Sequence, residues 1–267
     1  MIKQAELSAA LALGWSLLVT LGLASVGLMT GMLFGTRNLS LVVGACFELA
    51  LMLPAARFIG RLYVGSDRAQ ALATIGTSPL ELLIGASLGV LLQMPAGYVS
   101  ALLERRFPTP PEKLAAQLSQ LTPETPLLGA LMFAAVAMLV PFAEELFFRG
   151  ALFTALSRSS PPFVTVWTTS LAFTLAHLEP RNWAPLFLVA LVLGELRRRG
   201  GSIWAGVALH AAFNAATLGF VFVTRPVQLK PAESDWRMAV VGAALCVVGV
   251  WLFGRVAARR LAAEARR

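Results

Sequence analysis

The stretch that decides the fold runs from Leu127 to Leu156 and reads LLGALMFAAVAMLVPFAEELFFRGALFTAL. It is long enough to cross a bilayer, since about 20 apolar residues span the hydrocarbon core as a helix. Three of its residues, Glu144, Glu145 and Arg149, are nevertheless ionisable. Ionisable groups are costly in lipid, and they usually face the interior of a helix bundle for a functional reason. The stretch therefore predicts a membrane helix that carries part of a buried site.

The composition of the whole chain agrees with a membrane protein. Of its 267 residues, 57% are hydrophobic and 13% are charged, whereas a soluble domain has roughly 45–50% apolar and about 25% charged residues. The net charge of +8 does not indicate nucleic acid, because the Lys and Arg residues lie between apolar segments and at the C-terminus. The lipid bilayer, through its anionic headgroups, is the expected partner. Cys46 and Cys246 both lie in apolar runs, so we expect no disulfide.

We expect an all-α fold, a polytopic bundle of about eight transmembrane helices. The second, fifth and sixth apolar runs are short. The eight runs are Leu7–Phe34, Ser40–Ala56, Leu80–Leu103, Leu127–Leu156, Phe163–Leu178, Trp183–Leu196, Ile203–Val223 and Met238–Phe253. The first run is too long for a cleavable signal peptide.

The remaining sequence suggests a three-part organisation. Residues 1–126 form N-terminal membrane helices and an interfacial segment, 127–224 a catalytic core, and 225–267 a last membrane helix with a basic tail. Within the first part, Leu114, Leu118 and Leu121 recur at helical spacing after Pro110-Pro111. This pattern predicts an amphipathic helix on the membrane surface or over the bundle, although a simple connector would fit the sequence equally well.

The distribution of charge predicts the orientation of the bundle. With eight spans, one side receives 14 of the 22 Lys and Arg residues and the other side receives 8. The positive-inside rule then places both termini in the cytoplasm. Together with the bias toward Ala, Leu, Gly and Arg, this asymmetry is typical of a protein of the bacterial inner membrane.

Glu144, Glu145 and Arg149 form the first polar motif. Residues four apart share a helix face, so Glu145 and Arg149 are expected to pair. Glu144 points about 100° away, which leaves its carboxylate free to act as a base for water. The alternative is that the cluster caps a helix end at the headgroups, but apolar residues continue to Leu156.

His177 is the second polar position. Glu144 precedes Pro161 by 17 residues and His177 follows it by 16. In an antiparallel hairpin both residues would lie roughly 24 Å from the turn, at about 1.5 Å per residue. They can therefore meet if both face inward, and Phe173, one helical turn before His177, would form a wall of the site. A histidine that is merely hydrogen-bonded within the core is the alternative.

His210 and Asn214 form the third motif, again four apart on one helix face. Together they can donate two hydrogen bonds to one oxygen, as an oxyanion hole requires. Hydrogen bonding between membrane helices is the alternative. Of the other acidic residues in apolar runs, Glu48 is expected to be structural, and Glu195 is expected to lie at the interface beside Arg197–Arg199.

The ordered motifs EExxxR (Glu144-Glu145…Arg149), FxxxH (Phe173…His177) and HxxxN (His210…Asn214) resemble those of the CPBP family, also called the Abi or CAAX-protease family of intramembrane endopeptidases. The resemblance covers about Leu127 to Phe220, includes Gly200–Trp204 before the last motif, and implies about eight spans. It implies that Glu144 and His177 activate a water while His210 and Asn214 form the oxyanion hole. Glu145 and Arg149 would support the site.

A metal-dependent mechanism is the first alternative within this family. Glu144, His177 and His210 could ligate zinc with a water as fourth ligand. We favour a metal-free glutamic mechanism without a cofactor, because Asn214 suits an oxyanion donor better than a zinc ligand.

The expected substrate is a membrane-anchored protein or peptide precursor, with a C-terminal sorting signal, a bacteriocin-type leader or a prenyl group. Two functions of other classes remain open. One is a proton-coupled transporter. Transporters often have internal repeats and helix-breaking Gly/Pro pairs at matching positions of two halves, and this sequence shows neither. The other is a non-catalytic immunity or scaffold protein.

Overall fold

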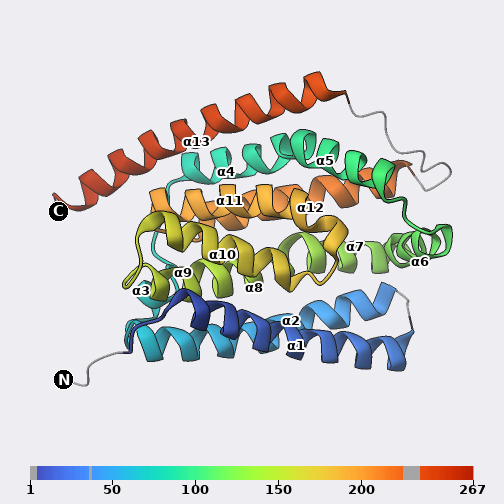
Figure 1. Ribbon diagram of the computed structural model, residues 1–267, viewed down its shortest axis with the longest axis horizontal. Coiled ribbons are helices and arrows are strands. Elements are labelled where there is room, and N and C mark those ends of the chain that lie inside the picture. Colours follow the sequence, from blue (N-terminus) through green and yellow to red (C-terminus); the bar gives the residue numbers. More distant parts are fainter. Residues whose placement is uncertain (1–4, 36–37, 225–234, 267) are drawn as a thin grey trace.

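The computed structural model describes residues 5–35, 38–224 and 235–266. Within these ranges every regular element is helical, and no strand is present. The long helices run side by side, and the first one begins at the end of the bundle where the last one ends (Figure 1). The all-α membrane bundle predicted from the sequence is therefore confirmed. Lys3, Arg37, Arg225, Lys230 and Arg267, which enter the charge count, lie outside the described residues.

Up to residue 125, the part of the chain that the structure describes forms two long helices, a helix pair and two shorter helices. These are α1 (Ala9–Phe34), α2 (Asn38–Tyr63), α3 (Arg68–Ala71), α4 (Pro79–Leu91), α5 (Gln93–Arg106) and α6 (Pro111–Leu121). Ser78 begins α4 with a capping box, in which its hydroxyl accepts from the backbone N–H of Glu81 and the Glu81 carboxylate accepts from the backbone N–H of Ser78. Such reciprocal bonds satisfy two backbone donors at a helix start.

The rest of the chain begins with one continuous run of helical segments over the predicted Leu127–Leu156 span. We call an uninterrupted run of helix a rod, and this one, which carries Glu144, is the central rod. Its segments are α7 (Pro126–Ala134), η1 (Ala135–Leu139), α8 (Val140–Glu144), η2 (Glu145–Leu152) and α9 (Phe153–Leu156). After it follow α10 (Pro162–Ala176), the short η3 (Pro180–Asn182), α11 (Trp183–Gly200), α12 (Trp204–Thr224) and α13 (Trp236–Glu264). The segments η1 and η2 are π-helical.

Each of the eight predicted spans corresponds to a helical rod, but eight membrane crossings are not confirmed. Among the described residues, six rods are long and apolar enough to cross a membrane. The other two are α10, which has 15 residues, and α11, which carries Glu195 and Arg197–Arg199 within its 18 residues. The second rod is longer than predicted, because the helix continues through Arg57 and Arg61 to Tyr63.

The helix predicted around Leu114, Leu118 and Leu121 is present as α6. Figure 1 places it at the end of the bundle opposite the start of α1. Asn38 ties its C-terminal end to α2, since its side-chain amide donates to the carbonyl oxygens of Gln120 at 2.8 Å and Thr122 at 3.0 Å. The position of α6 relative to a membrane surface stays a prediction.

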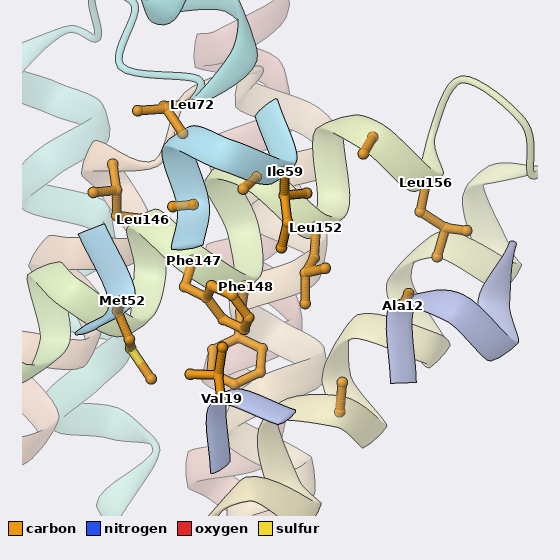
Figure 2. Close-up of a cluster of buried hydrophobic side chains, with 14 of the residues drawn as sticks. Ala12, Val19, Met52, Ile59, Leu72, Leu146, Phe147, Phe148, Leu152 and Leu156 are labelled. Carbon is orange, nitrogen blue, oxygen red and sulfur yellow. The ribbon is translucent and has the colours of Figure 1, made fainter. Parts of the chain in front are cut away.

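One hydrophobic cluster joins α1, α2 and α10 to the rod that carries Glu144. Figure 2 shows Met52 and Ile59 of α2 beside Phe147 and Phe148 of the rod. Residues 143–153 are all buried, so this part of the rod is covered on every side, as expected for a helix segment at the centre of a bundle. This central position holds the polar residues of the rod inside the protein.

A second cluster joins α4 and α5 to α11, α12 and α13. Glycine allows the closest approach: a Cβ on Gly89 would lie 2.1 Å from the carbonyl oxygen of Leu209. Small residues are enriched at membrane helix interfaces because they permit such backbone contact. Through this packing, α4 supports the side of α12 next to the helix face that bears His210.

Candidate active site

Glu144 lies where three helices meet. It is the last residue of α8 and its side chain is only 10% exposed. Its Oε1 lies 3.8 Å from Nε2 of His177, and its Oε2 lies 3.5 Å from Nε2 of His210. The equal distances of Glu144 and His177 from the Pro161 turn thus bring these residues together as the sequence predicts. The approach of His210, which rested on resemblance, is also present.

The position of His177 at the end of α10 determines how its ring points. It forms the C-cap of the helix, and its Nδ1 lies 2.9 Å from the carbonyl oxygen of Phe173. A carbonyl oxygen can only accept, so Nδ1 carries the hydrogen. In the neutral ring Nε2 is then an acceptor, and it is directed at Glu144.

Glu145 and Arg149 form the buried ion pair that their spacing predicts. Arg149 Nη1 donates to Glu145 Oε1 at 3.1 Å, and Nη2 donates to the carbonyl oxygen of Ala190 at 3.2 Å. Both side chains are fully buried. The guanidinium also stacks over Phe173, 4.3 Å from the ring centroid. Removal of either partner would leave an uncompensated charge in the core.

Phe173 occupies the wall position expected for it. Its ring centroid is 4.8 Å from that of His177 and 5.7 Å from that of His210. The ring contacts the guanidinium of Arg149 as well as both imidazoles. It therefore restricts the orientation of both histidines.

His210 lies between the two neighbouring glutamates. Besides the contact of Nε2 with Glu144, its Nδ1 lies 3.5 Å from Glu145 Oε1. Nδ1 and Glu145 Oε2 are both buried without a hydrogen-bond partner. Gly206, one turn earlier in α12, makes this approach possible, because a Cβ there would lie 2.8 Å from Glu145 Oε2.

Asn214, one turn after His210, also faces the central rod. Its Nδ2 donates to the carbonyl oxygen of Val136 at 2.9 Å. This bond uses one of two amide hydrogens and leaves the second available. Val136 belongs to the π-helical segment η1, so the bond fixes α12 against an irregular part of the rod.

Glu48 is closer to the site than the sequence suggested. Residues 45, 48, 52, 56, 59 and 63 form one stripe of α2; all except Glu48, which is half-buried, are buried. The carboxylate of Glu48 interacts electrostatically with that of Glu144. The spacing of 45, 48 and 52 at three and four residues is the sequence signal that places Glu48 on the face of α2 that packs on the rod. Its expected structural role stays a prediction.

Arg197 has different contacts from its two neighbours Arg198 and Arg199. Those two pair with Glu195 at 2.5–2.7 Å. Arg197 instead donates from Nε to the carbonyl oxygen of Arg149 at 2.9 Å. The three arginines therefore have two different environments.

A cleft of about 420 Å³ lies elsewhere, lined by Phe163, Trp167, Glu195 and Arg198 among others. Phe163 is at the start of α10, whereas His177 is at its end. The cleft is therefore separate from the glutamate–histidine site.

Glu144, His177 and His210 are of residue types that can ligate zinc. Among the residues that the structure describes, no group of three or more His, Cys, Asp and Glu side chains is arranged to hold a metal ion. Glu144 contacts each of the two histidines directly through polar atoms, His177 at 3.8 Å and His210 at 3.5 Å. Metal dependence and the absence of a cofactor stay predictions.

The fold and the site define a class: a membrane helix bundle with one carboxylate facing two imidazoles in its interior. Residues 126–216 match the family model described as "Type II CAAX prenyl endopeptidase Rce1-like". This segment contains all three motifs, and over it the resemblance to the CPBP (CAAX-protease) family is confirmed. No curated protein and no solved structure matches the chain.

Proposed function

We propose that the protein is an intramembrane endopeptidase that hydrolyses a peptide bond of a membrane-anchored protein or peptide precursor. The observation that carries the proposal is the convergence of the two Nε2 atoms of His177 and His210 on the two carboxylate oxygens of Glu144, at 3.8 and 3.5 Å. The family match over residues 126–216 supports a peptidase. We assign no role to a metal or another cofactor.

In the proposed reaction, Glu144 and His177 activate the attacking water. The 3.8 Å between Glu144 Oε1 and His177 Nε2 exceeds a hydrogen bond, and one water can hydrogen-bond both groups across such a separation. As the water oxygen bonds to the carbonyl carbon, one water proton passes to Glu144. Collapse of the intermediate breaks the C–N bond, and Glu144 returns that proton to the leaving amine.

His210 and Asn214 are proposed to stabilise the oxyanion. Asn214 has one amide hydrogen left after its bond to Val136. The Nδ1 of His210 faces Glu145, so the donor to the oxyanion would be Nε2. Nε2 can donate only when it carries a hydrogen. Removal of one such donor typically slows an acyl-transfer enzyme about 10²- to 10³-fold.

The substrate class follows from the setting of the site. A site within a membrane bundle favours a substrate held by a lipid anchor or a membrane helix, cleaved near the membrane boundary. We propose a protein with a C-terminal sorting signal or a bacteriocin-type precursor in a bacterial inner membrane, with both termini cytoplasmic. A prenylated substrate of the family type is the alternative.

The test compares Glu144→Gln with Glu145→Gln in cells. Proteins that accumulate uncleaved in a deletion strain identify the substrate, and its cleavage is then followed in each variant. Glu144→Gln is expected to abolish cleavage at normal protein level, because it removes only the base. Glu145→Gln breaks the buried pair with Arg149, which costs about 3–5 kcal/mol, so the protein level should fall at least as much as activity.

Normal cleavage by Glu144→Gln would overturn the assignment of the base. The purified wild type is also assayed after exhaustive chelation, where full activity is expected. Activity that disappeared and returned with zinc would replace the metal-free mechanism with the metal-dependent one.

A further inference from the structure

The rod that carries Glu144 changes its helical geometry directly after this residue. Residues Glu145–Leu152 form the π-helical segment η2. π-helices are rare, and their hydrogen bonds join residues five apart, so a turn is wider than in an α-helix. The direction of Glu145 and Arg149 relative to Glu144 therefore depends on what holds this segment in its π-helical form.

Arg197 of α11 contacts the rod through two nitrogens of its guanidinium. Besides the bond from Nε to the carbonyl oxygen of Arg149, Nη2 donates to Thr154 Oγ1 at 2.9 Å. The guanidinium carbon lies 5.0 Å from the ring centroid of Phe153. All three contacts are with the rod, within η2 and at the start of α9.

The charge of Arg197 has no acidic partner among the described residues. Glu195, the nearest carboxylate in sequence, pairs with Arg198 and Arg199. A partly buried cation that is satisfied by a carbonyl, a hydroxyl and a ring loses solvation without an ion pair in return. Stability alone is a weak reason for such a residue, so its two hydrogen bonds to the rod, one of them to the backbone, are the informative feature.

Arg149 is thereby held by α11 at two points. Its side chain donates to the carbonyl oxygen of Ala190, and its own carbonyl oxygen accepts from Arg197. Ala190 and Arg197 are seven residues apart, two turns along one face of α11. The two contacts fix both the backbone and the guanidinium of Arg149, the residue that pairs with Glu145.

We infer that Arg197 is a positioning residue of the peptidase site, which holds the π-helical turn in the register that directs Glu145 at Arg149 and His210. The inference rests on the proposed function, because it assigns Arg197 a part in that reaction. It acts through Arg149 and Glu145 and touches no reacting atom. When Arg197 is lost, the turn can relax toward α-helical geometry, and His210 loses its fixed neighbour.

The test uses the fact that the chain has two histidines, His177 and His210. The full chain, labelled with ¹⁵N-histidine and purified in detergent micelles, gives two imidazole signals, which His177→Gln assigns. Arg197→Gln is expected to shift the His210 ring signals while the protein remains folded. Arg198→Gln is the matched control, since Arg198 contacts Glu195 instead of the rod, and both rings should keep their wild-type signals.

Cleavage of the substrate found in the deletion strain gives the second readout. Arg197→Gln is expected to lower kcat roughly 10- to 100-fold with little change in KM, since small misplacements of catalytic groups have effects of this size. Arg197→Lys can bond one acceptor but lacks the guanidinium fork, so it should recover part of the rate. If Arg197→Gln does not fold, Arg197→Lys is the variant on which both measurements are made.

Unchanged His210 signals in a folded Arg197→Gln or Arg197→Lys variant would overturn the inference. Equal losses of kcat for Arg197→Gln and Arg198→Gln would do the same. If the wild type cleaved nothing, the proposed function would fail, while the ring signals would still decide whether Arg197 orients the histidine.

Discussion

Gly206 shows at the scale of one residue how closely α12 packs on the ion pair. A Cβ at this position would lie 2.8 Å from Glu145 Oε2 and 3.6 Å from Leu193 Cδ2. Glu145 is fully buried and bonded to Arg149, so it cannot move aside freely. We predict that Gly206→Ala costs about 1–3 kcal/mol, as overpacking of a core usually does. Thermal unfolding in detergent measures the loss, and cleavage of the substrate should fall with it.

Gly219→Ala is the control for this prediction, because Gly219 lies in the same helix and a Cβ there meets nothing within 4 Å. Alanine favours a helix over glycine by about 0.5–1 kcal/mol, so this variant should unfold at the wild-type temperature or above. If both variants behaved alike, close packing at Gly206 would not be the reason for its glycine.

Contacts that depend on spacing could be predicted from the sequence, and contacts that depend on helix rotation could not. The pair Glu145–Arg149 follows from four-residue spacing, and Glu144–His177 follows from equal distances to a turn. The bond from Asn214 to Val136 and that from Arg197 to Arg149 join helices whose relative rotation no spacing specifies. The nearness of Glu48 to Glu144 also depends on the rotation of α2 against another helix.

At the scale of elements, the loop after α10 ties the site to α6. Leu178, directly after His177, has a φ of 51°, in the left-handed region that such residues rarely adopt. The surroundings must hold a strained residue in place. Lys113 of α6 pairs with Glu179 at 2.5 Å, and Arg181 donates to Thr109 Oγ1 at 2.9 Å. The backbone that carries His177 is thus anchored to the start of α6.

We predict that Glu179→Lys slows cleavage up to about fivefold, because an exposed pair of this kind contributes at most about 1 kcal/mol. Its effect on unfolding should be equally small, since Lys113 and Glu179 are both partly exposed. The double exchange Lys113→Glu with Glu179→Lys restores the pair and should restore the initial cleavage rate. A double variant as slow as Glu179→Lys would contradict an anchoring role.

Helical elements were easier to predict than their local geometry. Apolar periodicity located all eight rods, and Pro110-Pro111 marked the start of α6. Nothing in the residue types of Glu145–Leu152 distinguishes a π-helix from an α-helix, because the difference lies in backbone hydrogen bonds imposed by neighbouring helices. The charged C-terminal end of α2 could not be predicted for another reason. The apolar run ends before Arg57, whereas the helix continues to Tyr63.

At the scale of the whole molecule, the two hydrophobic clusters join parts of the chain that are distant in sequence. Met52 of α2 and Phe147 of the rod belong to one cluster, and Leu88 of α4 and Phe253 of α13 belong to the other. The first 126 residues therefore help to build the surroundings of a site whose motifs all lie later. The division into residues 1–126, 127–224 and 225–267 stays a prediction. Together, the two hydrophobic clusters contain residues from all three of these parts.

Arg260 connects the last helix to the rest of the bundle, and its loss should destabilise the whole molecule. Its guanidinium donates to both oxygens of Glu81 at 3.0–3.1 Å, to the carbonyl oxygen of Gly200 at 2.6 Å and to Glu264. Glu81 is fully buried, so Arg260→Gln would leave the negative charge of Glu81 without an ion-pair partner. We expect the free energy of unfolding to fall by about 3–5 kcal/mol. Thermal unfolding in detergent checks this against Arg259→Gln, whose exposed side chain should matter by less than about 0.5 kcal/mol. Equal unfolding temperatures for the two variants would show that α13 is held by its apolar face alone.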